Sequence, residues 1–394
     1  MFDIDNPVLA ALAWSRLTEP GDAVAGALIN ALGPSEALRW LLQVQTDALS
    51  PPEPNPGALG STSLGKLLTA AQGWLPRLDG INPEQDLRNG ERVGAQLVLP
   101  TDPRWPARFT DLGMAAPLVL WVRGADDFAA RCQRSVALVG SRASTHYGEQ
   151  VTIEIAAGLA QRGFGVVSGG AYGIDAAAHR GTIVNGGYTV AFMAGGLDRP
   201  YPPGNTALLR AVMESGALVS EVPPGSTPYR NRFLARNRLI AALAGGTVVV
   251  EAAWRSGALS TARHASALLR PVGAVPGPVT SMASGGCHQL IRSGEAVLVA
   301  DAGEVAELAG SIEHDAAEVP LGEVDETEGL TLEQKRVYGV LPLQRPADAA
   351  AITRKAGLPL PVVLAALGIL EIRNLAQNKN NAWRRAPANL PPSA

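Results

Sequence analysis

The middle of the chain alternates between short apolar runs and longer amphipathic segments. Between residues 135 and 300 the apolar runs are SVALVG, GFGVVSGG, YTVAFMAGG, ALVSEV, TVVVEA, PVGAVPG and AVLVAD. Segments with helical periodicity separate them, at 148–163, 173–186, 205–216, 235–245 and 259–270. Apolar strands divided by amphipathic helices are typical of a parallel sheet covered on both faces. The pattern predicts an α/β fold with a doubly wound, extended Rossmann-like sheet, in which ligands bind beyond the carboxyl ends of the strands.

Two regions of different pattern flank this sheet. Residues 1–97 contain short helical segments around a proline- and glycine-rich connector, which predicts a small helical, SAM-like N-terminal domain. An extended stretch then leads into the apolar run PLVLWVRG, so we expect the Rossmann-like domain to cover 98–300. Within 329–394, three helical segments precede LAQNKNNAWRRA, which resembles two short strands around an Asn-rich turn. This order is typical of a winged-helix domain.

Charge is strongly segregated along the chain, although the net charge is only −3. Residues 135–300 carry thirteen arginines, no lysine and eight acids, and residues 329–394 carry nine basic residues against three acidic ones. Residues 301–328 carry ten acids and no Lys or Arg, so we expect an acidic linker there. Forked arginines suit phosphate oxygens, and a GC-rich genome would also favour arginine over lysine. The distribution predicts two cationic modules joined by an anionic linker.

The remaining composition narrows the class of protein. No apolar run reaches the roughly 18 residues of a membrane span, and the start MFDIDNPVLA lacks the basic residues of a signal peptide, so we expect a cytoplasmic protein. Two cysteines imply no disulfide framework. His179 follows Asp175 by one helical turn, a spacing that favours helix contacts over a metal site. We therefore expect no metal and no cofactor.

Four turns after the apolar runs combine glycine with a hydroxyl group or an arginine at the start of a helix. Gly140-Ser141-Arg142 follows the first run and Ser168-Gly169-Gly170 the second. Glycine lets the backbone approach a ligand, and the N–H groups and dipole of a helix N-terminus favour an anion. Because the carboxyl ends of parallel strands meet at one edge, we expect these turns to form one anion-binding rim.

The segment YRNRFLARNRLIAAL places four arginines within nine positions, namely Arg230, Arg232, Arg236 and Arg238. One phosphate needs one or two arginines, whereas a cluster along a sheet edge suits a row of phosphates, as in a polynucleotide backbone. We expect one or two of the four to form structural ion pairs, for which the candidates are Glu221, Glu251 and Asp198. Arg236 and Arg238 fall on the first turn of the expected helix 235–245 and should face the phosphates. Arg230 and Arg232 fall in an expected irregular stretch and should be more dispensable.

Several common nucleotide sites and catalytic motifs are disfavoured by the sequence. A G-x-G-x-x-G fingerprint would need glycines where Arg142 and Thr145 stand, and no acid ends the second strand to hold a ribose. The sequence contains no G-x-x-x-x-G-K-[ST] phosphate loop and no G-x-S-x-G elbow. We therefore expect a binding protein without catalytic residues.

At this point the motifs resemble a known family. VALVGSRASTHYG, VVSGGAYGIDAAAHRG, AGGLDRPYPPGN, GALVSEVPPG, FLARNRLIAALAGGTVVVEA, SGALSTARHA and AVPGPV with GCHQLIRSGEAVLV follow one another in an order and spacing similar to the DNA processing protein A (DprA/Smf) family. The resemblance is continuous over about 135–300. Two departures are the additional arginines ahead of FLARNR and the loosely matching N-terminal segment NALGPSEALRW.

The resemblance implies a single-stranded DNA binding protein of natural transformation and recombination. Such proteins dimerise through the Rossmann domain and help load the RecA recombinase past single-strand binding protein. By motif, the implied DNA-binding residues are Gly140, Ser141, Arg142, Ser168, Gly169, Gly170, Arg236, Asn237, Arg238, Ser256 and Gly257. Aromatic residues near the expected rim could stack on bases, and the candidates are Tyr147, Tyr172, Tyr201, Tyr229, Phe233 and Trp254.

Two alternatives use the same fold. One is a nucleotide-processing hydrolase similar to phosphoribohydrolases with a P-G-G-x-G-T-x-x-E site, but here Ala244 replaces the proline and Glu251 ends a strand. The other is a mononucleotide-binding sensor, which would have a single phosphate site. The winged helix could touch duplex DNA through Lys379, Arg384 and Arg385, yet its apolar third helix equally favours a protein contact. The acidic linker could compete with DNA for the rim.

Overall fold

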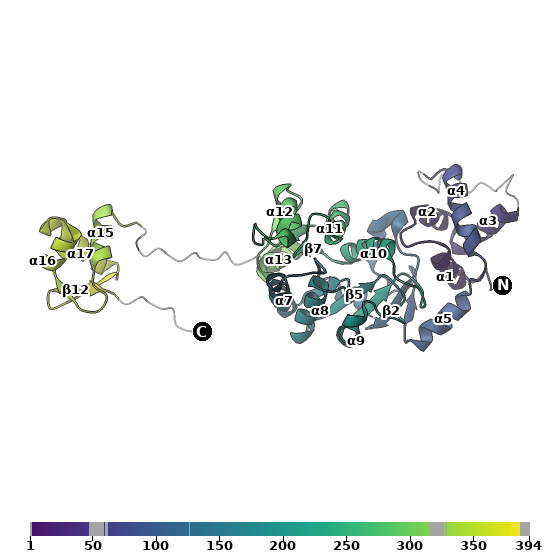
Figure 1. Ribbon diagram of the computed structural model, residues 1–394, viewed down its shortest axis with the longest axis horizontal. Helices are drawn as coiled ribbons and strands as arrows, with labels where there is room; N and C mark the ends of the chain where they lie inside the picture. Colours follow the sequence, from purple (N-terminus) through teal and green to yellow (C-terminus); the bar gives the residue numbers. More distant parts are fainter. Residues whose placement is uncertain are drawn as a thin grey trace. The chain divides into compact units, whose positions relative to one another are not determined.

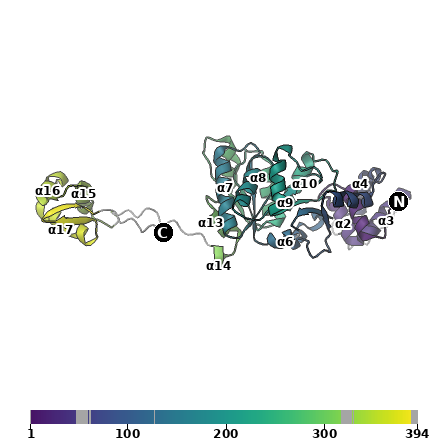
Figure 2. The same ribbon diagram turned by 90° about the horizontal axis from the view of Figure 1, so that it is seen from below.

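The computed structural model of the protein describes residues 2–46, 59, 62–125, 127–315, 327 and 329–386 (Figures 1 and 2). The chain divides into two compact units, 1–318 and 319–394. The first unit contains the N-terminal helices together with the large sheet. The second contains the C-terminal helices and a small sheet.

A nine-stranded sheet organises the first unit, with the strand order β1-β2-β6-β5-β4-β3-β7-β8-β9. The strands are β1 (Gln96–Val98), β2 (Leu120–Gly124), β3 (Ser135–Val139), β4 (Gly165–Ser168), β5 (Thr189–Met193), β6 (Ala217–Ser220), β7 (Gly246–Val249), β8 (Val272–Ala274) and β9 (Val297–Leu298). Strands β3 to β9 pair in parallel, and β1 and β2 add an antiparallel edge. All seven apolar runs are strands of one parallel sheet, which confirms the predicted Rossmann-like fold.

Helices cover both faces of this sheet (Figure 1). They are α6 (Phe128–Arg131), α7 (His146–Gln161), α8 (Ile174–Val184), α9 (Thr206–Ser215), α10 (Arg230–Leu243), α11 (Ala258–Ala267), α12 (Gly285–Arg292) and α13 (Ala302–Ala309). Alternate residues of β3 enter separate cores. Ala137 and Val139 pack with α10, α11 and α12, whereas Val136 and Leu138 pack with α7, α8 and α13. This two-sided burial explains why the strands read as continuous apolar runs.

Helix α10 begins earlier than the sequence predicts. It starts at Arg230 rather than at 235, with Tyr229 in an extended conformation as the N-cap residue. The prediction that Arg230 and Arg232 lie in an irregular stretch is therefore wrong, as is the placement of Arg236 and Arg238 on the first turn. The first turn has neither an acidic residue nor a side-chain cap, the two signals that normally mark a helix start.

The acidic segment is helical at its beginning. Asp301 accepts hydrogen bonds from the backbone N–H groups of Gly303 and Glu304 and so caps α13. Val305 and Ala306 are fully buried in the core shared with α7. A short helix, α14 (Ile312–Asp315), follows. The linker expected over 301–328 is therefore wrong for 301–315, because an apolar face lies among the acids; residues 316–326 and 328 lie outside the described part of the chain.

The N-terminal helices build a separate apolar cluster within the same unit. Its helices are α1 (Pro7–Leu17), α2 (Ala23–Leu32), α3 (Pro34–Thr46) and α4 (Leu64–Trp74), whereas α5 (Pro83–Arg92) packs Leu87 against the core of the sheet. Trp14 and Trp74 meet edge to face at 5.3 Å in the middle of this cluster. Arg16 pairs with Asp86 and also donates to the carbonyl of Pro224 beyond β6, which ties the helices to the sheet. The SAM-like assignment stays a prediction.

The C-terminal unit has the predicted order of elements. Helices α15 (Leu332–Val340), α16 (Ala349–Ala356) and α17 (Leu360–Ile372) precede β11 (Ala376–Lys379) and β12 (Ala382–Arg385), and β10 (Ala347–Asp348) completes an antiparallel sheet in the order β10-β12-β11. Asn380 and Asn381 form the turn with positive φ. The winged-helix assignment itself stays a prediction. No single described helix is long and apolar enough to cross a membrane; α16 and α17, bent by 107° at their junction, pass the length and composition test only as a pair.

Candidate nucleic-acid interface

A large cavity lies at the carboxyl ends of β3 and β7. These two strands are neighbours, and the strands that continue the sheet lie on opposite sides of them, so this is a topological switch point. Open parallel sheets bind ligands at such points. The cavity has a volume of about 990 Å³ and is bounded by the loop after β3, the first half of α10, the turn 253–257 and the start of α11.

Arginines dominate the lining of this cavity. Four of them are exposed, namely Arg142, Arg230, Arg255 and Arg263, and none forms an ion pair with any residue that the structure describes. Asp175 is the one acidic residue among the described lining residues, and it is buried. The cavity therefore presents several unpaired guanidinium groups, which is the donor set that phosphate oxygens prefer. We call this surface the arginine rim.

Arg236 forms the floor of the cavity rather than its rim. Its guanidinium is buried and donates to the carbonyl oxygen of Gly169 at 2.8 Å and to that of Phe192. Burial lowers its pKa to about 10, although the nearby Asp175 raises it. A Cβ on Gly169 would come within 2.5 Å of the guanidinium, so glycine is needed there. Arg236 thus joins the ends of β4 and β5 beneath the arginine rim.

The turn Ser168-Gly169-Gly170 lies behind this floor. The hydroxyl of Ser168 is buried and donates to the carbonyl of Leu138 on the neighbouring strand. None of the three residues lines the cavity, whereas Gly140 and Ser141 do. The guanidinium of Arg236 lies against Gly169, between this turn and the cavity, and contact of the turn with the phosphates stays a prediction.

The structure corrects the prediction for Arg238. Its guanidinium makes two hydrogen bonds to the carboxylate of Glu221, at 2.6 and 2.7 Å, and its Nε donates to the carbonyl of Ala115. Both partners of the ion pair are buried, with 5% and 10% of their side chains exposed. Arg238 faces away from the cavity, so the prediction that it faces the phosphates is wrong. The expected pairing of one or two arginines with acids is confirmed for Glu221.

Asn237, Ser256 and Gly257 connect the two helices that border the cavity. All three line it. The side-chain amide of Asn237 donates to the carbonyl of Gly257 at 3.3 Å, and its oxygen accepts from Nε of Arg236. The hydroxyl of Ser256 accepts from the N–H of Ala258 at the start of α11. This arrangement brings Arg236 and Asn237 of the Arg-Asn-Arg motif together with the Ser-Gly motif at one wall.

Aromatic side chains lie beside the arginines. The rings of Tyr201 and Phe233 are 5.8 Å apart, and the guanidinium of Arg142 lies 4.7 Å from the centre of the Phe233 ring. Both rings line the cavity together with Tyr229. Trp254 follows β7 and is 62% exposed, an unusual state for tryptophan. These rings offer flat apolar surfaces next to cationic groups, a combination that suits bases attached to phosphates.

The Asp175 and His179 pair on α8 is buried and does not form a metal cluster. Burial raises the pKa of Asp175 and lowers that of His179 to about 3. Nδ1 of His179 lies 2.7 Å from the hydroxyl of Thr189 in the neighbouring strand. Within the described ranges, no group of three or more His, Cys, Asp or Glu residues is arranged to hold a metal.

Sequence reasoning missed Arg255 and Arg263. Arg255 lies in the turn after β7, which the sequence marks as part of the rim, and Arg263 lies on the helix that follows it. These two arginines reach the cavity because β3 and β7 are neighbours at the switch point. No motif in the sequence indicates that the two strands are neighbours, because this depends on the strand order of the whole sheet.

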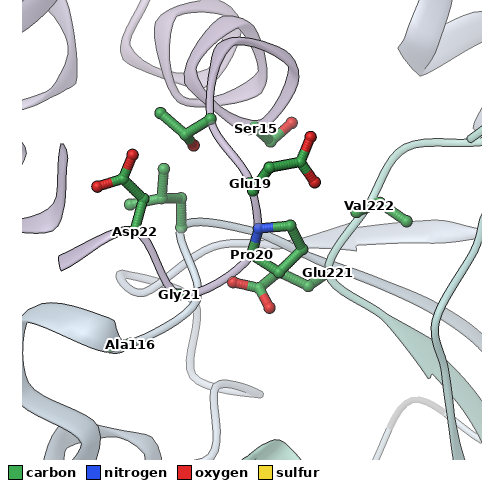
Figure 3. A pocket seen from close by; sticks show the side chains of 10 residues that line it. Ser15, Glu19, Pro20, Gly21, Asp22, Ala116, Glu221 and Val222 are labelled. Carbon is green, nitrogen blue, oxygen red and sulfur yellow. The ribbon is translucent and has the colours of Figure 1, made fainter. Parts of the chain in front are cut away.

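A small second cavity lies between the N-terminal helices and the sheet (Figure 3). Its volume is about 20 Å³, room for about one water molecule. Its lining includes Glu19 and Glu221, whose carboxylates pair with Arg232 and Arg238, and Asp22, which caps α2. A cavity of this size has no room for a phosphate group, and we do not count it as a binding site for phosphates.

A family model and several curated relatives match this chain, and they point to the same family. The family model described as DNA recombination-mediator protein A matches residues 96–310. A putative DNA processing protein DprA of Mycobacterium tuberculosis is 42% identical over 390 residues, which cover 96% of this chain and 95% of the relative. The DNA processing protein DprA of Streptococcus pneumoniae is 40% identical over 179 residues, which cover 45% of this chain and 62% of the relative.

A solved structure supports the same grouping. The X-ray structure of DNA processing protein A from Streptococcus pneumoniae is similar to this chain with a TM-score of 0.57 and 29% identity. The match covers 73% of this chain and 96% of that one. Sequence and fold agree over the sheet that carries the arginine rim: the chain belongs to the DNA processing protein A family of DNA recombination mediators.

Proposed function

We propose that the protein binds single-stranded DNA along the arginine rim and thereby acts as a mediator in recombination. The observation that carries the proposal is the set of four exposed, unpaired arginines around one cavity at the switch point of the sheet. They come from separate elements, since Arg142 follows β3, Arg230 and Arg263 lie on different helices and Arg255 follows β7. A ligand with several phosphates in a row satisfies such a set better than one phosphate does.

The aromatic residues favour a single strand over a duplex. In a single strand the bases are free to stack on protein rings, and stacking is tolerant of sequence. Tyr201 and Phe233 present such rings in the cavity, and the exposed Trp254 precedes Arg255 in the turn after β7. Because backbone contacts carry no sequence information, we expect little sequence preference.

The mononucleotide sensor is less well supported. Rossmann-type dinucleotide sites place a phosphate at the N-terminus of the helix after the first strand. Here the corresponding helix is α7, and the carboxylate of Glu251 accepts the N–H and the hydroxyl of its cap residue Thr145. A carboxylate at this position repels a phosphate. The phosphates of a ligand would therefore bind at the arginine rim and not at the N-terminus of α7, as expected for a polynucleotide.

The hydrolase alternative is also less well supported. Its catalytic acid would have to reach the cavity, but the carboxylate of Glu251 is buried against α7. Asp175 lines the cavity, yet it lies beside the buried Arg236 and accepts from the N–H of Ala171. We propose a binding role without turnover.

The partners that the family resemblance implies belong to the same proposal. We propose that the bound strand is passed to the RecA recombinase, past single-strand binding protein, during recombination and natural transformation. We also propose a homodimer through the Rossmann domain. Strand β9 supports this, because it pairs only with β8 among the described strands and exposes Val297 and Leu298. Edge strands of this kind are ready to pair with another chain.

The decisive experiment is a titration of fluorescein-labelled oligo(dT) at several salt concentrations. For a polynucleotide ligand the logarithm of the affinity should fall with the logarithm of salt, with a slope of roughly −0.7 per neutralised phosphate. We expect a slope that corresponds to several phosphates and no displacement by millimolar AMP. A flat salt dependence together with competition by AMP would contradict the proposal and favour the sensor. Light scattering of the free protein, and of a Leu298→Arg variant, tests the dimer.

A further inference from the structure

Glu251 holds both ends of the loop that carries Arg142. Its carboxylate accepts the backbone N–H of Thr145 at 2.9 Å and the hydroxyl of Thr145 at 2.6 Å. Its backbone carbonyl accepts the N–H of Ser141 at 2.7 Å. The residue is 2% exposed, so these bonds are shielded from water. One residue at the end of β7 thus fixes the loop 141–145 at both ends.

The same carboxylate completes the start of α7. Thr145 is the cap residue of this helix, and its hydroxyl oxygen also accepts the N–H of Gly148. A side chain at Gly148 would collide with the carboxylate of Glu251, so glycine leaves the space that the carboxylate fills. A negative group at a helix N-terminus is favourable because of the helix dipole. The chain therefore supplies its own anion where other Rossmann-type folds bind a phosphate.

Besides Glu251, few described hydrogen bonds hold the loop, and one of them joins the hydroxyl of Ser144 to the carboxylate of Glu149 at 2.7 Å. The N–H of Ile174 donates to the carbonyl of Ser141 and secures the first residue of the loop. Arg142 is exposed and contacts the ring of Phe233, without an ion pair to any residue in the described ranges. The direction in which its guanidinium enters the cavity therefore depends on how the loop is held at Thr145.

We propose that Glu251 is a positioning residue for DNA binding, which clamps the loop 141–145 so that Arg142 projects into the cavity. This inference rests on the proposed function, because it assumes that the arginine rim binds a strand. In this proposal Glu251 does not contact the DNA. Its substitution lowers the DNA affinity because Arg142 is then no longer held in position.

Two substitutions of Glu251 distinguish the effect of its hydrogen bonds to Thr145 from the effect of its negative charge. Glu251→Asp keeps the charge but is one methylene too short to reach Thr145, so we expect oligo(dT) affinity to fall about tenfold, the size of one lost charge-assisted contact. Glu251→Gln keeps the length and an acceptor, so we expect a fall of about threefold. The matched control is Glu154→Gln, on the exposed side of the same helix. Glu154 accepts the side-chain amide of Gln150 among the described hydrogen bonds, makes none of them to the loop and does not line the cavity. Its substitution should leave the affinity unchanged.

Coupling to Arg142 distinguishes positioning from general loss of structure. In an Arg142→Ala background, Glu251→Asp should lower the affinity by less than about twofold, since the contact it positions is already gone. In an Arg263→Ala background the fall should remain about tenfold, because Arg263 lies on α11 and has no bond to the loop. A purely structural role of Glu251 would lower the affinity equally in all three backgrounds, and that result would overturn the inference.

The remaining outcomes are also decisive. Wild-type affinity of Glu251→Asp would overturn the inference. If circular dichroism shows that this variant is unfolded, Glu251→Gln decides in the same three backgrounds, with a loss expected in all but Arg142→Ala. If Arg142→Ala and Arg263→Ala themselves bind as the wild type does, the proposed function fails. If those two bind weakly while the Glu251 variants bind normally, only the positioning role fails.

Discussion

Helix α10 contributes arginines to two different regions of the molecule. Arg230 and Arg236 belong to the cavity at the switch point, whereas Arg232 and Arg238 belong to the contact with the N-terminal helices. In the contact, a carboxylate meets each arginine, Glu19 for Arg232 and Glu221 for Arg238. In the cavity, the exposed Arg230 meets none among the described residues. An arginine of this helix is therefore available to a phosphate only where the fold places no carboxylate beside it.

The largest effect should come from the contact side. Arg238→Ala removes one partner of a buried ion pair and leaves the carboxylate of Glu221 without its cation, which costs about 3–5 kcal/mol of unfolding free energy. Urea denaturation, followed by a signal from the first unit, measures this change in unfolding free energy. Arg230→Ala is the matched control on the same helix and should change the unfolding free energy by less than about 0.5 kcal/mol. Equal stability of both variants would remove the distinction between the two regions.

The next effect should come from the cavity side, in affinity rather than in stability. Arg142→Ala should weaken oligo(dT) binding about tenfold, because it removes a charge-assisted contact. It should also reduce the salt slope by roughly 0.7, the share of one phosphate on a single strand. Anisotropy titrations at several salt concentrations measure both quantities. Arg232→Ala, whose arginine is already paired with Glu19, serves as the control and should leave the slope unchanged. An equal salt slope for Arg142→Ala and Arg232→Ala would show that no phosphate is bound at Arg142.

A smaller effect should separate base contacts from phosphate contacts. Trp254→Ala should weaken binding of oligo(dT) about fivefold, the lower end of what stacking of one base contributes. It should not weaken binding of an abasic strand of the same length, which offers phosphates but no bases. Arg142→Ala should weaken both ligands, and Trp254→Phe should restore part of the loss. An equal loss of both ligands in Trp254→Ala would show that the indole acts on the fold rather than on a base.

The smallest effect should come from the outer pair of the contact. Arg232 and Glu19 are 17% and 39% exposed, so water screens their attraction. Arg232→Ala should lower the unfolding free energy by about 0.2–1 kcal/mol, and a double-mutant cycle with Glu19→Ala should give a coupling of the same size. A coupling as large as that of the Arg238 pair would contradict the difference in burial between the two.

The sequence predicts the sheet well because its signal is local. Each strand is a continuous apolar run, and burial on both faces of a parallel sheet requires such runs wherever they occur. The turn with Gly140 can also be read from the sequence, since Gly140 and Ser141 follow β3 directly. Both features depend on a few neighbouring residues, so neither needs knowledge of the rest of the chain.

The errors arise where the deciding partner is distant in sequence. Arg238 and Arg230 look alike in the sequence, and what separates them is Glu221, seventeen residues away from Arg238 and brought beside it only by folding. The start of α10 was placed too late because it lacks a capping signal. Helix α13 lies in a stretch whose many acidic residues predict a linker, although its apolar positions Val305 and Ala306 are buried against the sheet's core.

The space between Gly148 and Glu251 has a consequence for how this family varies. The carboxylate of Glu251 occupies the volume that a side chain at 148 would need, so the two positions cannot change independently. A methyl group at 148 would displace the carboxylate of Glu251 from Thr145 unless residue 251 were shorter, and in either case the N-terminus of α7 would lose that carboxylate. A chain with such a pair of replacements would leave the N-terminus of this helix free for a phosphate.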